Sequence, residues 1–260
     1  MTAEQYLNQI ITKYDARNLL AYSHELLRLK TILKSWASSC FLNIIDSGSR
    51  AKGTAISIAS DVDYVISLTN NCNENNGGLK GIYDSLFKRL TAEYPVVRKQ
   101  NVSCRINLNG LQVDITPAKK HSGNTNYHWI YRSKSDQYHQ TNIQQHINDI
   151  STSGRTNEIK IIKIWRELNK LDIPSIYLEY LIIKNILFNK PKDSNKLGSN
   201  AFYILTELAK DTNNPLFSRV VDPANSNNIL SDLLSQNEKL DIIKAAKVAV
   251  QQPYWSNIIW

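Results

Sequence analysis

This sequence of 260 residues lacks the features that mark membrane-spanning, secreted and cysteine-rich proteins. No apolar run approaches the roughly 20 residues of a membrane-spanning helix, so we expect no segment that crosses a membrane. The first residues, MTAEQYLNQI, include polar and acidic side chains and no apolar core of a secretory signal, so we expect none. Cysteine is also scarce.

The three cysteines are Cys40, Cys72 and Cys104. Their odd number, their wide spacing and the lack of a C-x-x-C pair argue against a zinc ribbon and against a disulfide framework. This usage fits a protein of the reducing cytoplasm.

The composition is that of a globular protein with an excess of positive charge. Hydrophobic residues make up 42% of the chain, and its length suits one large domain or two packed lobes. The formal net charge of +8 attracts polyanions, which include nucleic acid, membrane surfaces and nucleoside triphosphates. The charge does not choose among them, and a basic surface without a partner stays an alternative.

The first half of the chain combines helices with strands. Residues 4–39 contain no glycine or proline and carry apolar residues at helical spacing, which predicts one or two long helices. Runs rich in β-branched residues follow, separated by turn residues. The expected elements are a strand at 62–68, a loop at 70–78, a helix at 81–94 and two strands within 96–117 that are joined at Asn109-Gly110.

The second half is helical after a segment, residues 121–155, that fits no period. From residue 157 onward the apolar residues recur at helical spacing. Strands in the first half and helices in the second predict an α+β fold with two lobes, at residues 1–150 and 151–260.

The first candidate for a functional site is Gly48-Ser49, between a predicted strand and a turn. Glycine lets the backbone approach a phosphate, whose oxygens then accept hydrogen bonds from free N–H groups and from the serine hydroxyl. Most Gly-Ser pairs are plain turns, so this pair alone is weak support.

Two carboxylates, Asp61 and Asp63, stand at the start of the next predicted strand. Because side chains alternate along a strand, both lie on one face while Val62 and Tyr64 point into a core. Adjacent carboxylates repel each other unless a cation neutralises them, and hard oxygen ligands suit Mg²⁺. A solvated strand end is the alternative.

A third carboxylate, Asp114, lies in mid-strand between Val113 and Ile115, which face the other side. Such a carboxylate either faces solvent or has a function. If its strand neighbours the strand of Asp63, the three carboxylates can hold two metal ions about 3.5–4 Å apart, the arrangement used for in-line displacement at phosphorus.

In this order the motifs GSRAKGTAI, SDVDYVISL and VDITPA resemble the active-site motifs of polymerase-beta-type nucleotidyltransferases. More narrowly, they are similar to the branch that contains oligoadenylate synthase, cyclic GMP-AMP synthase and the bacterial CD-NTases. EIKIIKIWREL, PSIYLEYL and VVDPANSNNIL resemble helices of that branch, so the resemblance covers the chain from about Ser47 onward. It implies a bilobed polymerase-beta-like fold: a mixed-sheet catalytic lobe with a long N-terminal spine helix, and a helical lobe that closes the active-site cleft.

The resemblance implies roles for the motif residues. Gly48 and Ser49 would hold the triphosphate of the donor nucleotide. Asp61 and Asp63 would bind two Mg²⁺ ions, for which Mn²⁺ could substitute. Asp114 would share the metal near the attacking hydroxyl and orient that hydroxyl.

Further positions match in the helical part. Lys163 corresponds to the family lysine that contacts phosphate; the alternative is a surface lysine whose stem covers apolar neighbours. Ser175 begins the motif whose serine reaches donor phosphates. The next residue in relatives is often an aromatic that stacks on a base, but here it is Ile176, and Tyr177 could take that role only in a shifted register.

Asn157 takes the position of a polar residue that contacts a nucleobase in the family. Its amide offers a donor and an acceptor, which matches the edge of uracil or cytosine. Asparagine is also favoured as a helix N-cap, so both hypotheses stay open.

The resemblance implies synthesis of a cyclic di- or trinucleotide second messenger from ribonucleotide triphosphates, with release of pyrophosphate, in bacterial anti-phage defence. A downstream effector would sense the product. The Cys/His insertion by which the animal cyclic GMP-AMP synthase clamps DNA is absent, so we expect no obligatory DNA or RNA, and we expect a monomer.

Two alternatives stay open. One is a linear 2′-5′ oligoadenylate-type synthase that RNA stimulates. The other is a non-catalytic nucleotide-binding protein of the same fold, against which the presence of all three carboxylates and of Gly48-Ser49 argues.

Overall fold

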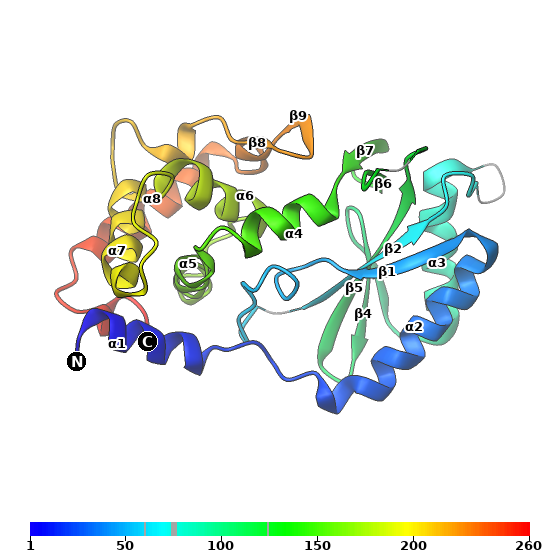
Figure 1. Cartoon of the computed structure of the whole chain (residues 1–260), viewed down its shortest axis with the longest axis horizontal. Helices are drawn as coiled ribbons and strands as arrows, with labels where there is room; N and C mark the ends of the chain where they lie inside the picture. The colour runs from blue at the N-terminus through cyan, green and yellow to red at the C-terminus, as the bar shows by residue number, and fades with distance from the viewer. Residues whose placement is uncertain (60, 74–76, 124) are drawn as a thin grey trace. The chain divides into compact units, whose positions relative to one another are not determined.

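The computed structural model describes residues 1–59, 61–73, 77–123 and 125–260. The predicted loop at 70–78 therefore lies partly outside the described residues. The chain forms two compact units (Figure 1). The helical unit comprises Met1–Arg17, Lys52–Ser60 and Asn148–Trp260, and the sheet unit comprises Asn18–Ala51 and Asp61–Ile147.

The lobes at residues 1–150 and 151–260 stay a prediction; in the structure the sheet unit ends at Ile147, and two earlier segments join the helical unit. Residues 1–17 and 52–60 belong to the helical unit and not to the unit that carries the sheet. The sequence pattern could not show this, because both segments join their unit through contacts with residues more than 90 positions away.

The sheet unit is built on a mixed sheet. Its described strands run in the order β1-β2-β5-β4-β3, with β6 beside β5 and β7 beside β6. β2 and β5 pair in parallel, whereas β1 pairs with β2 and β4 with β5 in the antiparallel sense. The strands are β1 (Phe41–Asp46), β2 (Val62–Leu68), β3 (Val97–Lys99), β4 (Cys104–Leu108), β5 (Leu111–Lys120), β6 (His128–Arg132) and β7 (Gln137–Thr141).

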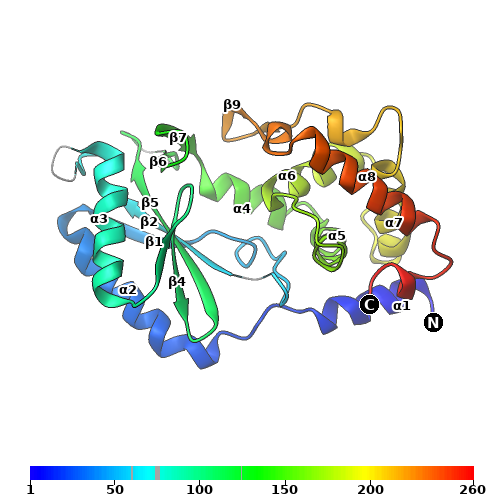
Figure 2. The ribbon, with the colours of Figure 1, turned by 180° about the vertical axis from the view of Figure 1, so that it is seen from behind.

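Alternation along the central strands separates an apolar face from a polar one. Val62, Tyr64 and Ile66 of β2 are at most 3% exposed, and Val113 and Ile115 of β5 are fully buried. All five belong to the apolar cluster that the sheet forms with two helices on this face (Figure 2). These helices are α2 (Ser23–Ala37) and α3 (Gly78–Glu93).

The predicted hairpin is confirmed, with a tight turn between β4 and β5. Asn109 and Gly110 adopt φ angles of +50° and +89°, the left-handed conformations that this turn type requires. The Gly110 N–H donates to Asn107 Oδ1 at 2.7 Å. Residues 96–117 form three strands and not the expected two, because the chain turns between β3 and β4, where the Gln100 N–H donates to the Ser103 carbonyl at 2.8 Å.

The helical unit packs its helices around a second apolar cluster. Two of the helices begin with a capping box, formed by Thr2 with Gln5 and by Ser235 with Glu238. No helix in the described part of the chain is long and apolar enough to cross a membrane. The main elements are α1 (Ala3–Lys13), α5 (Thr156–Leu168), α6 (Ser175–Tyr180), α7 (Leu197–Leu208), α8 (Gln236–Val250), β8 (Val221–Asp222) and β9 (Asn225–Ile229).

The expected spine helix is in fact two helices, α1 and α2, which belong to different units. Leu7 and Ile10 of α1 pack into the helical cluster, whereas Leu29 and Leu33 of α2 pack under the sheet. Of the one or two long helices predicted for residues 4–39, the structure has two amphipathic helices with separate cores. The unclassified segment 121–155 contains β6, β7 and α4 (Ile143–Ser151).

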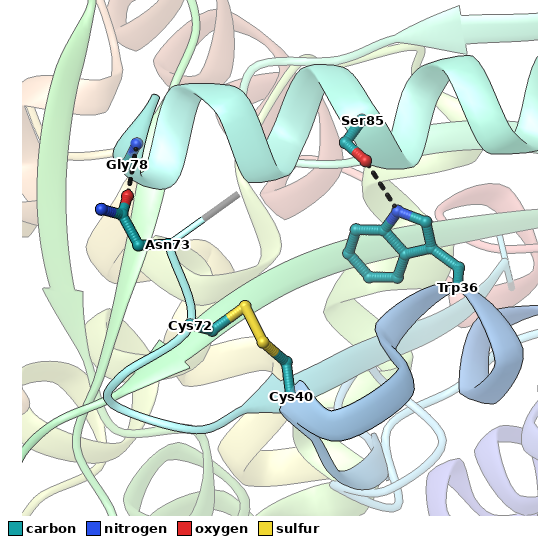
Figure 3. The surroundings of a disulfide bond; sticks show 6 residues. All are labelled: Trp36, Cys40, Cys72, Asn73, Gly78 and Ser85. Carbon is teal, nitrogen blue, oxygen red and sulfur yellow. Dashed lines mark hydrogen bonds between the residues drawn. A yellow bond between two sulfur atoms is a disulfide. The ribbon is translucent and has the colours of Figure 1, made fainter. Parts of the chain in front are cut away.

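Cys40 and Cys72 form a disulfide, although the number and spacing of the cysteines argued against a disulfide framework (Figure 3). Their Cα atoms are 5.4 Å apart although 32 positions separate them in sequence. The antiparallel pairing of β1 with β2 places Phe41 opposite Leu68 and so brings the flanking segments together. This proximity arises only in the folded sheet, so the spacing of the cysteines could not show it.

We expect Cys40→Ser with Cys72→Ser to lower the free energy of unfolding by about 3 kcal/mol under oxidising conditions, because the cross-link restricts the unfolded chain. Urea unfolding followed by circular dichroism measures this difference. A reductant should lower the stability of the natural sequence by a similar amount and leave the double variant unchanged. Equal stability of the two oxidised proteins would contradict the expectation.

Candidate active site

A row of charged side chains crosses the polar face of the sheet, opposite the face that α2 and α3 cover. The strand register places Asp63 of β2 beside Asp114 of β5, Asp114 beside Arg105 of β4, and Arg105 beside Arg98 of β3. Residues opposite each other on neighbouring strands share a face of the sheet. Two carboxylates are thus followed by two guanidinium groups in one line.

The three predicted carboxylates come together in the sheet unit. The strand of Asp114 had to neighbour the strand of Asp63 for this, and β2 and β5 are neighbours with the two residues in register. Asp61 directly precedes β2, and its Oδ2 atom shares one hydrogen-bond donor with Asp114. Their role as metal ligands stays a prediction.

Arg105, which the sequence analysis did not single out, is that shared donor. Its Nη2 atom lies 2.9 Å from Asp61 Oδ2 and 2.6 Å from Asp114 Oδ2, and its Nε atom lies 2.9 Å from Asp114 Oδ1. The hydrogen bonds to Asp114, helped by the charges of Asp114, Asp61 and Asp63, raise the pKa of the guanidinium against the opposing effect of burial. Arg105 therefore stays charged at every physiological pH.

The register of the hairpin could have revealed Arg105. A two-residue turn at Asn109-Gly110 fixes which residues of β4 and β5 stand opposite each other. Counting back from the turn pairs Leu108 with Leu111 and Arg105 with Asp114, as the structure has it.

The donor set fits a divalent cation of the Mg²⁺ type, although no three acidic, histidine or cysteine side chains among the described residues converge in a preformed ligand cluster. Arg105 instead bridges Asp61 and Asp114, which shows that these two carboxylates can address a single cationic centre. Carboxylate oxygens are the ligands that Mg²⁺ prefers.

Gly48 packs directly against Asp63. A Cβ atom added at Gly48 would overlap with the carboxylate of Asp63, so this position accepts only glycine while Asp63 keeps its place. Ser47 fixes the approach, because its N–H and its hydroxyl donate to the Asp63 carbonyl at 2.9 Å and 3.2 Å. Gly48 and Ser49 thus lie beside the carboxylates, and their contact with a triphosphate stays a prediction.

Lys163 lies in the helical unit and is 2% exposed, which excludes the alternative of a surface lysine. Its Nζ atom donates to Glu179 Oε1 at 2.6 Å and to Thr54 Oγ1 at 2.9 Å. Lys52 donates to Glu179 Oε2 at 2.9 Å. Glu179, which the sequence analysis missed, therefore joins α6 to α5 and to the segment that follows Gly48-Ser49.

Charge stabilises this buried network. Burial alone raises the pKa of the Glu179 carboxyl, but the ammonium groups of Lys52 and Lys163 outweigh it, so the pKa lies well below its ordinary range. Burial lowers the pKa of the Lys163 ammonium, and Glu179 opposes that effect. A buried charge without its partner is strongly destabilising, so each member depends on the others. Contact of Lys163 with phosphate stays a prediction.

Ser175 begins α6, as the sequence predicted. Its Oγ atom accepts a hydrogen bond from Arg166 Nη1 at 3.0 Å. Ile176 packs against the helical cluster, and Tyr177 is fully buried with its hydroxyl donating to the Leu216 carbonyl at 3.1 Å. Tyr177 therefore cannot stack on a base, and the hypothesis of a shifted register is wrong.

Asn157 is exposed and is the second residue of α5. The N-cap is Arg155, so the hypothesis that Asn157 caps the helix is wrong. Contact with a base stays a prediction.

Comparisons with known proteins agree with this geometry. The family model described as Second Messenger Oligonucleotide or Dinucleotide Synthetase domain matches residues 1–153. The cyclic AMP-AMP-AMP synthase of Escherichia coli (strain MS 115-1) is 27% identical over 237 residues, which cover 78% of this chain and 73% of that protein.

Two solved structures share the fold. E. coli MS115-1 CdnC with ATP has a TM-score of 0.71 at 21% identity, over 95% of this chain and 90% of that one. The Bradyrhizobium diazoefficiens CD-NTase CdnG in complex with GTP has a TM-score of 0.72 at 11% identity, over 96% and 92%. These likenesses confirm the predicted resemblance and the polymerase-beta-like α+β fold.

We expect Gly48→Ala to lower the rate of pyrophosphate release at least ~10²-fold, because the added methyl group displaces Asp63, and shifts of about 1 Å at a reacting centre have effects of this size. Ser47→Ala adds no atom and should lower the rate less than ~10-fold. Circular dichroism checks that both variants fold. An unchanged rate in folded Gly48→Ala would contradict the proposed contact between this loop and the reacting groups.

Proposed function

The chain belongs to the Second Messenger Oligonucleotide or Dinucleotide Synthetase family and is a nucleotidyltransferase of the cyclic-oligonucleotide-synthase kind, and from this premise we propose that it joins ribonucleotide triphosphates into a cyclic di- or trinucleotide with release of pyrophosphate. The observation that carries the proposal is the set of three carboxylates on one sheet face with Gly48 packed against Asp63. The proposed phosphate-binding and cation-binding groups are thus adjacent, an arrangement that suits nucleotidyl transfer.

Asp61, Asp63 and Asp114 are the proposed ligands of two Mg²⁺ ions, for which Mn²⁺ substitutes. Such ions, when bound, neutralise the triphosphate and lower the pKa of the attacking hydroxyl. Asp114 orients this hydroxyl toward the α-phosphorus and accepts its proton. Gly48 and Ser49 hold the donor phosphates through backbone N–H groups and the Ser49 hydroxyl.

Lys163 and Ser175 of the helical unit are proposed to contact donor phosphates. The hydroxyl of Ser175 accepts from Arg166, so its own hydrogen can point to a phosphate oxygen. Thr54 and Glu179 engage two of the three N–H donors of Lys163, so a contact with phosphate would use the third and would depend on the buried network that holds the ammonium in place.

We further propose a cytoplasmic monomer that acts in bacterial anti-phage defence, needs no DNA or RNA, and makes a product that a separate effector senses. The name of the E. coli relative specifies a product of three AMP units, which makes ATP the first substrate to examine. Asn157 motivates the additional hypothesis that a pyrimidine nucleotide is used, since its exposed amide matches the edge of uracil or cytosine.

We expect Asp61→Asn with Asp63→Asn to lower product formation at least ~10³-fold, since the loss of metal stabilisation amounts to several kcal/mol and each ~1.4 kcal/mol is tenfold. The assay is incubation with all four ribonucleotide triphosphates and Mg²⁺, without nucleic acid, followed by mass spectrometry. Asp211→Asn with Asp241→Asn removes the same charge from two exposed surface ion pairs and should leave the product unchanged.

Near-normal turnover in the Asp61/Asp63 double variant would overturn the metal assignment. A natural protein that is silent alone but makes linear 2′-5′ product with duplex RNA would favour the oligoadenylate-type alternative.

We expect Asn157→Ser to change which triphosphates enter the product, because serine lacks the paired donor and acceptor of the amide. The melting temperature should stay unchanged, since Asn157 is exposed and does not cap its helix. Mass spectrometry of the products from mixed triphosphates measures the effect. An identical product mixture would remove Asn157 from base recognition.

A further inference from the structure

Arg105 occupies the place that a cation bound by Asp61 and Asp114 would take. Its guanidinium engages both oxygens of Asp114 and one oxygen of Asp61 through bonds of 2.6–2.9 Å. The side chain of Asp114 is only 15% exposed and that of Arg105 29%, so solvent screens this interaction only in part. In this arrangement one lone pair on each oxygen of Asp114 is directed at Arg105.

Like charge prevents a simple coexistence. A divalent cation bound by Asp61 and Asp114 would lie within a few ångströms of the guanidinium if Arg105 kept its bonds, and the two positive charges would repel each other. Arginine does not lose its proton at physiological pH, so it can relieve this repulsion only by moving.

The structure offers Arg105 an alternative place. Its Nη1 atom already donates to Gln112 Oε1 at 2.6 Å. A cavity of about 90 Å³ lies beside it, lined by Asn107, Gln112 and Arg98 among others. The amide oxygens of Asn107 and Gln112 accept N–H groups without carrying charge, while the charge of Arg98 limits how far Arg105 can turn toward it. A rotation of the side chain toward these amides releases the carboxylates and keeps the guanidinium hydrogen-bonded.

We propose that Arg105 is a positioning residue that holds Asp61 and Asp114 together in the metal-free protein and yields them to the divalent cation by turning toward Gln112. The inference rests on the proposed function of the three carboxylates as metal ligands. A divalent cation therefore displaces the guanidinium of Arg105 from the carboxylates when it binds, and does not fill an open site.

The test measures Mn²⁺ binding without nucleotide, by electron paramagnetic resonance of the free ion, together with thermal melting in EDTA and in Mn²⁺. We expect Arg105→Gln to bind Mn²⁺ about tenfold more tightly than the natural protein, which corresponds to ~1.4 kcal/mol, because the competing charge is gone. In EDTA the variant should melt at a lower temperature, because the carboxylates lose their counter-charge, and Mn²⁺ should raise its melting temperature more than that of the natural protein.

Two further variants sharpen the comparison. Arg28→Gln removes the same charge from α2, which covers the other face of the sheet, and should change Mn²⁺ affinity less than ~2-fold. Arg105→Lys keeps the charge but cannot bridge two carboxylates as the planar guanidinium does, so its Mn²⁺ affinity should fall between those of the natural protein and Arg105→Gln. If Arg105→Gln does not fold, Arg105→Lys decides alone, and an unchanged affinity then overturns the inference.

The result also separates this inference from the proposed function. Mn²⁺ binding that Asp61→Asn with Asp63→Asn abolishes, but that Arg105→Gln leaves equal to Arg28→Gln or weakens, overturns the role of Arg105 alone. Mn²⁺ binding that is indifferent to the aspartates overturns both.

Discussion

The parallel pairing of β2 with β5 is the constraint on which the candidate site depends. It sets Asp63 beside Asp114 on the polar face while Val62 and Val113 enter the core on the other. A slip of one residue between these strands would turn every side chain of one strand to the opposite face, so the core that fixes the register also fixes the carboxylates. The site is therefore positioned by apolar packing that lies on the far side of the sheet.

A second constraint acts on the segment that follows Gly48-Ser49. Gly48 is held against Asp63, and a few residues later Lys52 and Thr54 bind the buried carboxylate of Glu179 in the helical unit. Each end of this segment is thus held within its own unit, Gly48 in the sheet unit and residues 52–54 in the helical unit. The buried ion pairs add little net stability compared with apolar packing, and their value lies in fixing one arrangement of α5, α6 and residues 52–54.

The sequence predicted the local features of the site well and its long-range contacts poorly. Period-two alternation was enough to assign the faces of Asp61, Asp63 and Asp114, and the Asn109-Gly110 turn was enough to find the hairpin, because both depend on neighbouring residues only. The disulfide of Cys40 with Cys72 and the membership of residues 1–17 in the helical unit depend on contacts across the fold. Arg105 lies between these cases, since the hairpin register alone places it opposite Asp114.

Repulsion among the three carboxylates affects the stability of the sheet unit before any cation is bound. Three acidic side chains on one face repel one another, and without a counter-charge their repulsion would oppose the pairing of β2 with β5. Arg105 supplies a positive charge from the neighbouring strand, in a hairpin whose turn forms locally. The carboxylates can then be set in place by folding alone, and cation binding becomes a later exchange at a finished site. Folding and metal affinity are thereby coupled through Arg105, because the charge that stabilises the metal-free sheet unit is the one that a cation would have to displace.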